Sequence, residues 1–258
     1  MVGVLKMGKD LHSNIIRNFE EASDNYNQSA VIQKIFAHKL AKQCLHQNIN
    51  PGIWLDLGSG TGLLADILED LHPSQLVIRV DGAKEMLEQH SPQKQLKLWD
   101  LELGLPTNLS RSPNLIASNF ALHWLTEPRV KIQQWFSALA PGGWLAIALP
   151  VKGCFPEWHA AAKSAKVICT AMNFPSSISL ANAIPTENIR FNELERYTQT
   201  EVEIASLLKP IIKVGAHTTP KKSLKISHWR RLYNNWPKST HSNKPQLTWL
   251  VQILLAQK

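Results

Sequence analysis

The sequence predicts an α/β fold built on a doubly wound, mainly parallel sheet, with N-terminal helices and a helical cap insertion. Short apolar runs alternate with helical patterns between residues 53 and 149, which is typical of parallel strands joined by crossover helices. The first run, Ile53–Leu57, passes directly into glycines at positions 58, 60 and 62. Acidic residues stand at the ends of the first three predicted strands, at the edge where such sheets bind ligands.

The length of 258 residues suits a single elaborated domain spanning 1–258. We expect its core at about 48–150, completed by C-terminal strands. A helical lid is expected at about 11–47 and the cap insertion at about 155–190.

The predicted elements follow from periodicity and from turn residues. Apolar residues at helical spacing predict a helix over 30–47, which Asn50-Pro51-Gly52 ends. Strands are predicted at 53–57, 76–80, 96–99, 115–118 and 144–149, and helices at 63–71, 84–90 and 130–140. Residues 191–225 are mixed, 228–236 suggest a short helix, and 246–255 suggest a closing strand.

Composition excludes several classes. No apolar run approaches the ~20 residues of a membrane span, and the N-terminus is too polar for a secretory signal. The three cysteines are widely spaced and form no Cys-x-x-Cys pair, so we expect neither a disulfide framework nor a metal site. A cytoplasmic location fits these observations.

The glycine-rich turn is the most informative motif. Gly58, Gly60 and Gly62 allow a sharp turn without Cβ clashes and let a ligand approach main-chain N–H groups at the start of a helix. A dinucleotide fingerprint, Gly-x-Gly-x-x-Gly, has its third glycine one residue later, so an NAD oxidoreductase is disfavoured. Asp56 stands just ahead of the turn, and Asp-x-Gly-x-Gly-x-Gly resembles the first motif of S-adenosylmethionine (SAM) methyltransferases.

The next strand ends carry further candidates. Asp81 follows Gly62 by nineteen residues, and a carboxylate there can accept hydrogen bonds from both ribose hydroxyls of an adenosine. Asp100 closes the third strand, where its side chain can meet an adenine amino group and Leu101 can offer a backbone N–H. Either aspartate could instead cap a helix or stabilise a turn.

Ser118–Trp124 follows the fourth strand, where the donor should meet the acceptor. Asn119 could bond the methionine end of the cofactor, while His123 and Trp124 could line the acceptor pocket. Packing is the alternative, since a tryptophan is more often core and a lone histidine more often structural.

Several motifs together resemble the malonyl-acyl-carrier-protein O-methyltransferases of biotin synthesis. The likeness covers nearly the whole chain, and its early and late segments are more specific than the glycine turn. It rests on Phe19-x-x-Ala22-x-x-x-Tyr26-x-x-x-Ala30-x-x-Gln33, Leu55–Gly62, Met86-Leu87, Ser118–Trp124, Pro141-Gly-Gly143, Gly153–Trp158 and Leu207–Ala216. The chain departs from the family pattern at Asn114, at Gly82 and at Trp99-Asp-Leu.

The resemblance implies a Rossmann-like class I fold that uses SAM and no metal to methylate the free carboxylate of malonyl-acyl-carrier protein. It assigns the cofactor to Asp56, Gly58, Ser59, Gly60, Gly62, Asp81, Gly82, Met86, Asp100, Leu101 and Asn119. It places the substrate near Tyr26, His123, Trp124 and Arg129, with Tyr26 and His123 as the catalytic candidates. A malonyl carboxylate is already ionised at pH 7, so alignment rather than a general base should carry the reaction.

The C-terminal segment is one-sidedly basic. Residues 204–258 contain ten Lys and Arg and no Asp or Glu, while the whole chain has a net charge of +8. Such a segment suits an acidic partner, here an acyl-carrier protein, although a merely solvated basic face is the alternative. The expected docking residues are Lys221, Lys222, Lys225, Arg230 and Arg231.

Two other functions remain open. Another SAM methyltransferase could act on a small acid such as trans-aconitate, on a quinone precursor or, less in keeping with the motifs, on nucleic acid. A methyltransferase-like protein could also bind a partner without turnover, although the intact glycine turn and Asp81 argue against that.

Overall fold

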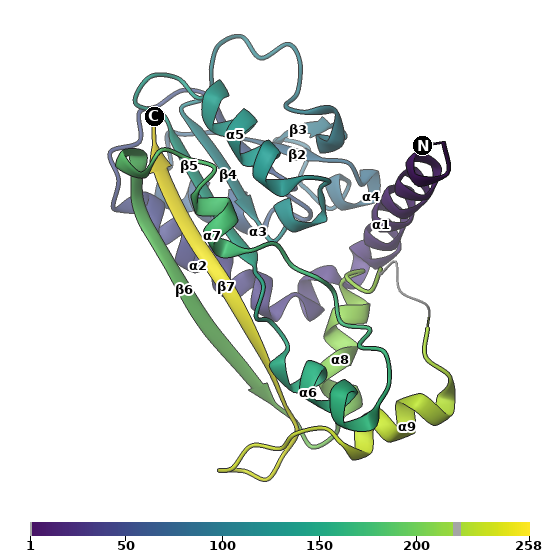
Figure 1. Ribbon diagram of the computed structural model, residues 1–258. Helices are drawn as coiled ribbons and strands as arrows, with labels where there is room; N and C mark the ends of the chain where they lie inside the picture. Colours follow the sequence, from purple (N-terminus) through teal and green to yellow (C-terminus); the bar gives the residue numbers. More distant parts are fainter. Residues whose placement is uncertain (1, 219–222) are drawn as a thin grey trace.

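The computed structural model describes the backbone of residues 2–218 and 223–258, and side chains from residue 11 onward within those ranges. Its centre is a seven-stranded sheet of order β3-β2-β1-β4-β5-β7-β6 (Figure 1). The strands are β1 (Trp54–Leu57), β2 (Val77–Asp81), β3 (Gln95–Leu98), β4 (Leu115–Asn119), β5 (Trp144–Pro150), β6 (Ile189–Thr200) and β7 (Gln246–Gln257).

Strand direction divides the sheet into two parts. β1 to β5 are parallel to their neighbours, whereas β7 lies antiparallel to both β5 and β6. The chain runs outward from β1 to β3 and then returns to place β4 on the other side of β1. The order therefore reverses between β1 and β4, and a doubly wound sheet binds its ligand at the carboxyl ends of the strands beside this point.

Helices cover both faces of the sheet. They are α1 (Val2–Ser29), α2 (Val31–Leu45), α3 (Leu63–Leu71), α4 (Lys84–Leu87), α5 (Pro128–Ala138), α6 (Pro156–Ala165), α7 (Ser177–Ala181), α8 (Ile204–Lys213) and α9 (Ile226–Asn234). Short 3-10 helices occur at η1 (Leu101–Leu103), η2 (Leu122–Trp124) and η3 (Thr186–Asn188). α2 and α3 pack in the buried cluster on one face, and α5 and α7 pack in the cluster on the other.

The buried strand β5 shows why the sheet needs both layers. Trp144, Ala146 and Ala148 enter one cluster, while Leu145 and Ile147 enter the other. Successive side chains of a strand point to opposite faces, so an uninterrupted apolar run is buried only when helices cover both sides.

Two groups of helices extend beyond this core. α1 is a long helix that contacts α4 and α8, and it closes one side of the molecule. α6, α8 and α9 gather around one end of the long paired strands β6 and β7 (Figure 1). No helix in the described part of the chain is both long enough and apolar enough to span a membrane.

The predicted doubly wound α/β fold is confirmed, with the predicted strands at their expected places to within two residues. The helix predicted at 84–90 is shorter, because α4 ends at Leu87. β6 and α8 lie in the stretch expected to be only mixed. β6 is an edge strand whose side chains are all at least partly exposed, so its sequence lacks the apolar alternation that marks a half-buried strand.

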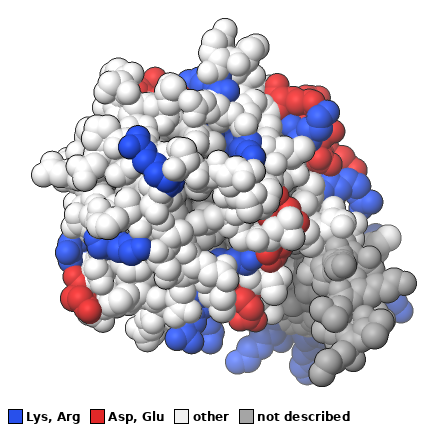
Figure 2. All heavy atoms as spheres, turned by 90° about the horizontal axis from the view of Figure 1, so that it is seen from above, with Lys and Arg blue, Asp and Glu red and all other residues white. Residues whose placement is uncertain are grey.

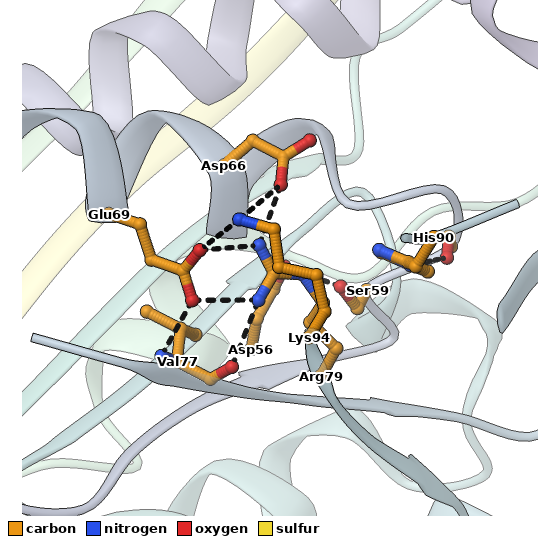
Figure 3. A network of polar contacts seen from close by, with 9 residues as sticks. Asp56, Ser59, Asp66, Glu69, Val77, Arg79, His90 and Lys94 are labelled. Atoms are coloured by element: carbon orange, nitrogen blue, oxygen red, sulfur yellow. Dashed lines mark hydrogen bonds and ion pairs between the residues drawn. The ribbon is translucent and has the colours of Figure 1, made fainter. Parts of the chain in front are cut away.

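Charged side chains are scattered over the face shown in Figure 2, where blue and red groups adjoin one another in several places. A different arrangement holds α3 against β2. Arg79 on β2 is fully buried and binds Asp66 (2.6 Å) and Glu69 (2.8 Å) of α3, and Lys94 also pairs with Glu69 (Figure 3). This network holds α3, the helix that begins at the glycine turn, against β2.

Protonation of Glu69 should lower the stability of the fold at acid pH. Burial would raise its pKa, but hydrogen bonds from Arg79 and Lys94 outweigh burial and lower it to about 2. The stabilising charge is therefore complete above the ordinary pKa of 4.5 and is lost as pH falls toward 2. We expect Glu69→Gln to lose about 1–3 kcal/mol at pH 7 and to flatten the decline between pH 4.5 and 2 in denaturant titrations.

Asp70→Asn is the matched control, because Asp70 is exposed on the same helix. It should leave both the stability and its pH dependence unchanged. An unaltered acid limb in Glu69→Gln would show that the network does not depend on this charge.

Candidate functional site

A cavity of about 110 Å³ opens at the carboxyl ends of β1, β2 and β4, beside the point where the strand order reverses. We call it the cofactor cavity. Its lining includes Asp56, Gly58, Ser59, Gly60, Asp81, Gly82, Met86, Asp100, Leu101 and Asn119, which are all the predicted cofactor residues except Gly62. The N-terminal helix α1 covers it, contributing Ile16, Phe19 and Tyr26. The structure thus brings residues from five separate stretches of the chain to one place.

The glycine turn lies along one wall of this cavity. Gly58 has a φ of +71°, and a Cβ there would lie 2.1 Å from the Cβ of Ala121, so no larger residue fits. Gly60 has a φ of +55° and open space beside it, so only its left-handed backbone favours glycine. The Gly60 N–H donates to Oδ2 of Asp81 at 2.7 Å, which ties the turn to the end of β2.

Gly62 has a different role from the one predicted. It lies outside the cavity lining, and a Cβ at this position would lie 2.4 Å from Cε1 of His90. His90 in turn bonds the carbonyl of Gly60 through Nε2 at 2.9 Å (Figure 3). Because a carbonyl only accepts, Nε2 carries the proton. The small residue at 62 therefore makes room for a histidine that holds the turn from behind, and this histidine was not predicted.

Asp81 and Asp56 are the two carboxyl groups nearest the turn. Asp81 accepts from the N–H of Ala83 at 2.8 Å as well as from Gly60, and burial raises its pKa although these backbone donors oppose the shift. Asp56 accepts from Oγ of Ser59 at 2.9 Å, and burial raises its pKa to about 7. Oδ1 of Asp56 has no hydrogen-bond partner among the described residues.

Two amides next to Asp56 also have unpartnered oxygens. The Nδ2 group of Asn119 donates to the carbonyl of Gln33 at 3.0 Å, which leaves Oδ1 of Asn119 without a partner. Oε1 of Gln33 is likewise buried and unpartnered within the described chain. A buried polar atom without a partner costs about 1–3 kcal/mol, so three such acceptors in one cavity lining suit a ligand that carries donors or positive charge.

Asp100 has in part the capping role that was the alternative to ligand binding. Its Oδ1 accepts from the N–H of Glu102 at 2.9 Å and so caps η1, while Oδ2 lies 3.1 Å from Nε2 of His12 on α1. The residue still lines the cavity. Lys131, which was not predicted, donates to the carbonyls of Leu101 (3.1 Å) and Glu102 (2.7 Å) and holds this loop in place.

A second cavity of about 250 Å³ adjoins the first, and we call it the acceptor cavity. The two share Phe19, Tyr26, Gln33, Phe120 and Trp124. The rest of its lining comes from His123 of η2, from α6, α8, α9 and β7, and from the loops beside these elements. Among the described lining residues there is no Asp, Glu, Lys or Arg.

The predicted substrate residues divide between this cavity and the surface. His123 and Trp124 line the acceptor cavity, and Tyr26 lies at the junction of both cavities. Burial and the nearby Asp81 raise the pKa of Tyr26 well above its ordinary value, so its hydroxyl stays protonated. Arg129 is exposed at the start of α5 and lines neither cavity, so the structure does not bring it to the site.

The chain belongs to a known enzyme family. Residues 27–188 match the family of the methyltransferase domain, which covers the glycine turn and the first five strands. Together with the fold, this makes the protein a class I SAM-dependent methyltransferase. Two solved structures share the architecture: the YcgJ protein of Bacillus subtilis (TM-score 0.56, 13% identity, 86% of this chain and 98% of that one) and a SAM-dependent methyltransferase of Archaeoglobus fulgidus (0.51, 12%, 88% and 94%).

Comparison with individual enzymes is more specific than the family match. The malonyl-[acyl-carrier protein] O-methyltransferase 2 of Coxiella burnetii is 24% identical over 257 residues, 98% of each chain. The corresponding Xylella fastidiosa enzyme is 27% identical over 212 residues, 78% of this chain and 71% of its own. The trans-aconitate 2-methyltransferase of Variovorax paradoxus is 35% identical over 99 residues, but the match spans only 37% of this chain and 38% of that enzyme.

The cofactor cavity fits SAM on its own chemistry. Asp81 would accept from the ribose hydroxyls, with Gly60 holding its carboxylate in place. The unpartnered oxygens of Asp56, Asn119 and Gln33 would receive the positively charged amino end of the methionine moiety. When bound, SAM would supply an electrophilic methyl group, and these residues would bind and orient it.

His90 should control cofactor affinity without touching the cofactor. We expect His90→Ala to raise the Kd for S-adenosylhomocysteine by about three- to tenfold, because the Gly60 peptide loses a hydrogen bond of about 0.5–1.5 kcal/mol. Isothermal titration calorimetry measures this directly. His90→Gln, which restores an N–H donor, should recover most of the affinity.

His38→Ala is the matched control, since His38 is exposed on α2 and lines neither cavity. Thermal melting of each variant separates lost binding from lost folding. Wild-type affinity in His90→Ala would refute the supporting role.

Proposed function

We propose that this methyltransferase transfers the methyl group of SAM to the free carboxylate of a malonyl thioester carried by an acyl-carrier protein. The product would be the malonyl methyl ester that primes biotin synthesis. The carrying observation is the acceptor cavity, which adjoins the cofactor cavity and has no Asp, Glu, Lys or Arg in its described lining. The relatives that match 98% and 78% of this chain support the same substrate.

The charge of the cavity favours a malonyl thioester over trans-aconitate. A carboxylate buried without a partner is strongly disfavoured, and each additional one needs its own cation or set of donors. trans-Aconitate carries three carboxylates, whereas a malonyl thioester carries one and is otherwise neutral. The trans-aconitate relatives keep that substrate as the second candidate, although their match is confined to 99 residues.

The reaction requires little of the protein beyond positioning the two reactants. When bound, SAM supplies a methyl group on a sulfonium, and its transfer to a carboxylate oxygen gives a neutral ester and S-adenosylhomocysteine with no proton released. Tyr26, Phe120 and Trp124 would hold the carboxylate where the two cavities meet and exclude water from it. Neither Tyr26 nor His123 needs to act as a base, since the nucleophile is already ionised.

The direct test is methyl transfer from labelled SAM to malonyl-acyl-carrier protein, with the ester identified by mass spectrometry. We expect the wild type to methylate the malonyl thioester and not trans-aconitate. Asp81→Ala should lower kcat/KM by about 10- to 100-fold, because it removes charge-assisted hydrogen bonds to the ribose.

Complementation of a biotin auxotroph that lacks this activity gives the same test in cells. Growth with the wild type and none with Asp81→Ala is the expected result. Turnover of trans-aconitate with none of the malonyl thioester would transfer the assignment to the second candidate.

A carrier protein would dock through the basic C-terminal segment. Lys225, Arg230 and Arg231 are exposed at and along α9, whose Trp229 lines the acceptor cavity. Ile226 is 74% exposed beside them and offers an apolar contact. Lys221 and Lys222 lie outside the described residues. Acyl-carrier proteins are small and acidic, so this surface would steer them toward the cavity.

Reversing the charges at Lys225, Arg230 and Arg231 to Glu should raise KM for malonyl-acyl-carrier protein by about tenfold at low salt. The effect should shrink at high salt, because screening weakens steering between exposed charges. Carrier-free malonyl-pantetheine should show no change. Steady-state kinetics with both substrates at two ionic strengths measures the difference.

Lys34→Glu with Lys42→Glu is the matched control, since both lysines are exposed on α2 and line neither cavity. Equal losses with the carrier-bound and carrier-free substrates would exclude α9 as the docking site.

A further inference from the structure

Five aromatic rings form a closed circuit within the lining of the acceptor cavity. The distances between ring centroids are 6.3 Å for His123–Phe120, 6.0 Å for Phe120–Trp249, 4.6 Å for Trp249–Phe155, 5.7 Å for Phe155–Phe174 and 5.5 Å for Phe174–His123. The members come from the loop after β4, from the segment around α6 and from β7. We call this set the aromatic circuit.

The backbone holds two members of the circuit in a strained conformation. Phe120 and Phe155 have φ values of +57° and +58°, in the left-handed region that bulky residues rarely adopt. Such a conformation costs about 1–3 kcal/mol at each position and is found mainly where function needs it. The fold keeps this conformation at both phenylalanines, which indicates that the positions of the two rings are important for function.

The circuit and its neighbours provide neutral donors in place of charges. Both residues that flank His123 in the circuit are phenylalanines, and burial lowers the pKa of His123 to about 3, so its ring is neutral at pH 7. Nδ1 of His123 has no partner among the described residues. The same holds for Oγ1 of Thr170 and Nε1 of Trp158 and Trp249, all from the lining of this cavity.

We propose that the acceptor's carboxylate is held beside the aromatic circuit, where Phe120 meets the cofactor cavity, by neutral hydrogen-bond donors, with the imidazole of His123 as the principal one and no cation from the described residues opposite it. This inference rests on the proposed function and adds the recognition chemistry. It defines the substrate class as acyl groups with one free carboxylate on an otherwise neutral chain.

The reaction itself gives neutral recognition an advantage. The acceptor carboxylate loses its charge as it becomes an ester, so a cation beside it would stabilise the starting state more than the transition state. Neutral donors orient the oxygen while leaving it reactive in an apolar surrounding. A second carboxylate on the acceptor would be buried without a counter-charge, so di- and tricarboxylic acids are excluded.

The experiment uses carrier-free malonyl-pantetheine and compares the full-length wild type with His123→Leu and His123→Gln. We expect His123→Leu to lower kcat/KM by about 10- to 100-fold, because a hydrogen bond to a charged group contributes about 1.5–3 kcal/mol. His123→Gln, which keeps a neutral N–H donor, should retain activity within about threefold. His123→Leu, but not His123→Gln, should also weaken binding of malonyl-pantetheine to the S-adenosylhomocysteine complex, measured by calorimetry.

Two further measurements make the outcome decisive. An unchanged Kd for S-adenosylhomocysteine shows that each variant keeps its fold and cofactor cavity. Lys221→Ala with Lys222→Ala tests a cation from outside the described residues, and it should leave both kcat/KM and Kd for malonyl-pantetheine unchanged.

Wild-type kinetics in His123→Leu, or a large loss in the double lysine variant, would overturn neutral recognition while the malonyl assignment stands. Methylation of free malonate or trans-aconitate by the wild type would also overturn it. If the wild type neither binds nor methylates malonyl-pantetheine, the proposed function itself fails.

Discussion

Both main-chain polar groups of Gly60 are hydrogen-bonded, and the shape of the cofactor cavity depends on these two bonds. Its N–H donates to Asp81 at the end of β2, and its carbonyl accepts from His90 behind the turn. The glycine turn therefore cannot shift without moving the carboxylate that would bind the ribose. Arg79 extends this support, because its bonds to Asp66 and Glu69 fix the helix that follows the turn against the same strand.

The two cavities differ in charge in a way that matches the two reactants. The cofactor cavity contains three carboxyl groups, those of Asp56, Asp81 and Asp100, and the described lining of the acceptor cavity contains no Asp, Glu, Lys or Arg. Acidic groups suit a cationic cofactor, whereas the proposed acceptor would contribute a negative charge that the reaction removes. Placing a strong cation on the acceptor side would oppose that loss of charge. The pKa shifts of Tyr26 and His123 keep both side chains neutral, which is consistent with a reaction that needs no general base.

Much of the fold and of the cofactor cavity could be predicted because the signals are local. Gly58, Gly60 and Asp81 occur at fixed spacing around one strand-turn-helix unit, and the strands around them are uninterrupted apolar runs. His90 could not be predicted, because its role depends on the space above Gly62, which only the folded chain defines. Trp249 was also missed: it reaches the acceptor cavity because β7 returns antiparallel beside β5, more than a hundred residues along the chain. Arg129 was predicted near the substrate, but it is exposed at the start of α5 and lines neither cavity.

Just over half of the described lining of the acceptor cavity lies outside the part of the chain that matches the family. The matched segment is 27–188, whereas Phe19, Leu208, Trp229 and Trp249 line the cavity from α1, α8, α9 and β7. Membership of the family therefore accounts for the methyl donor but leaves the acceptor to the flanking segments. The same flanking segments carry the basic residues of α9 beside the cavity. Under the proposed function, α9 would serve both features, because it carries the exposed Arg230 and Arg231 of the docking surface and places Trp229 in the lining of the acceptor cavity.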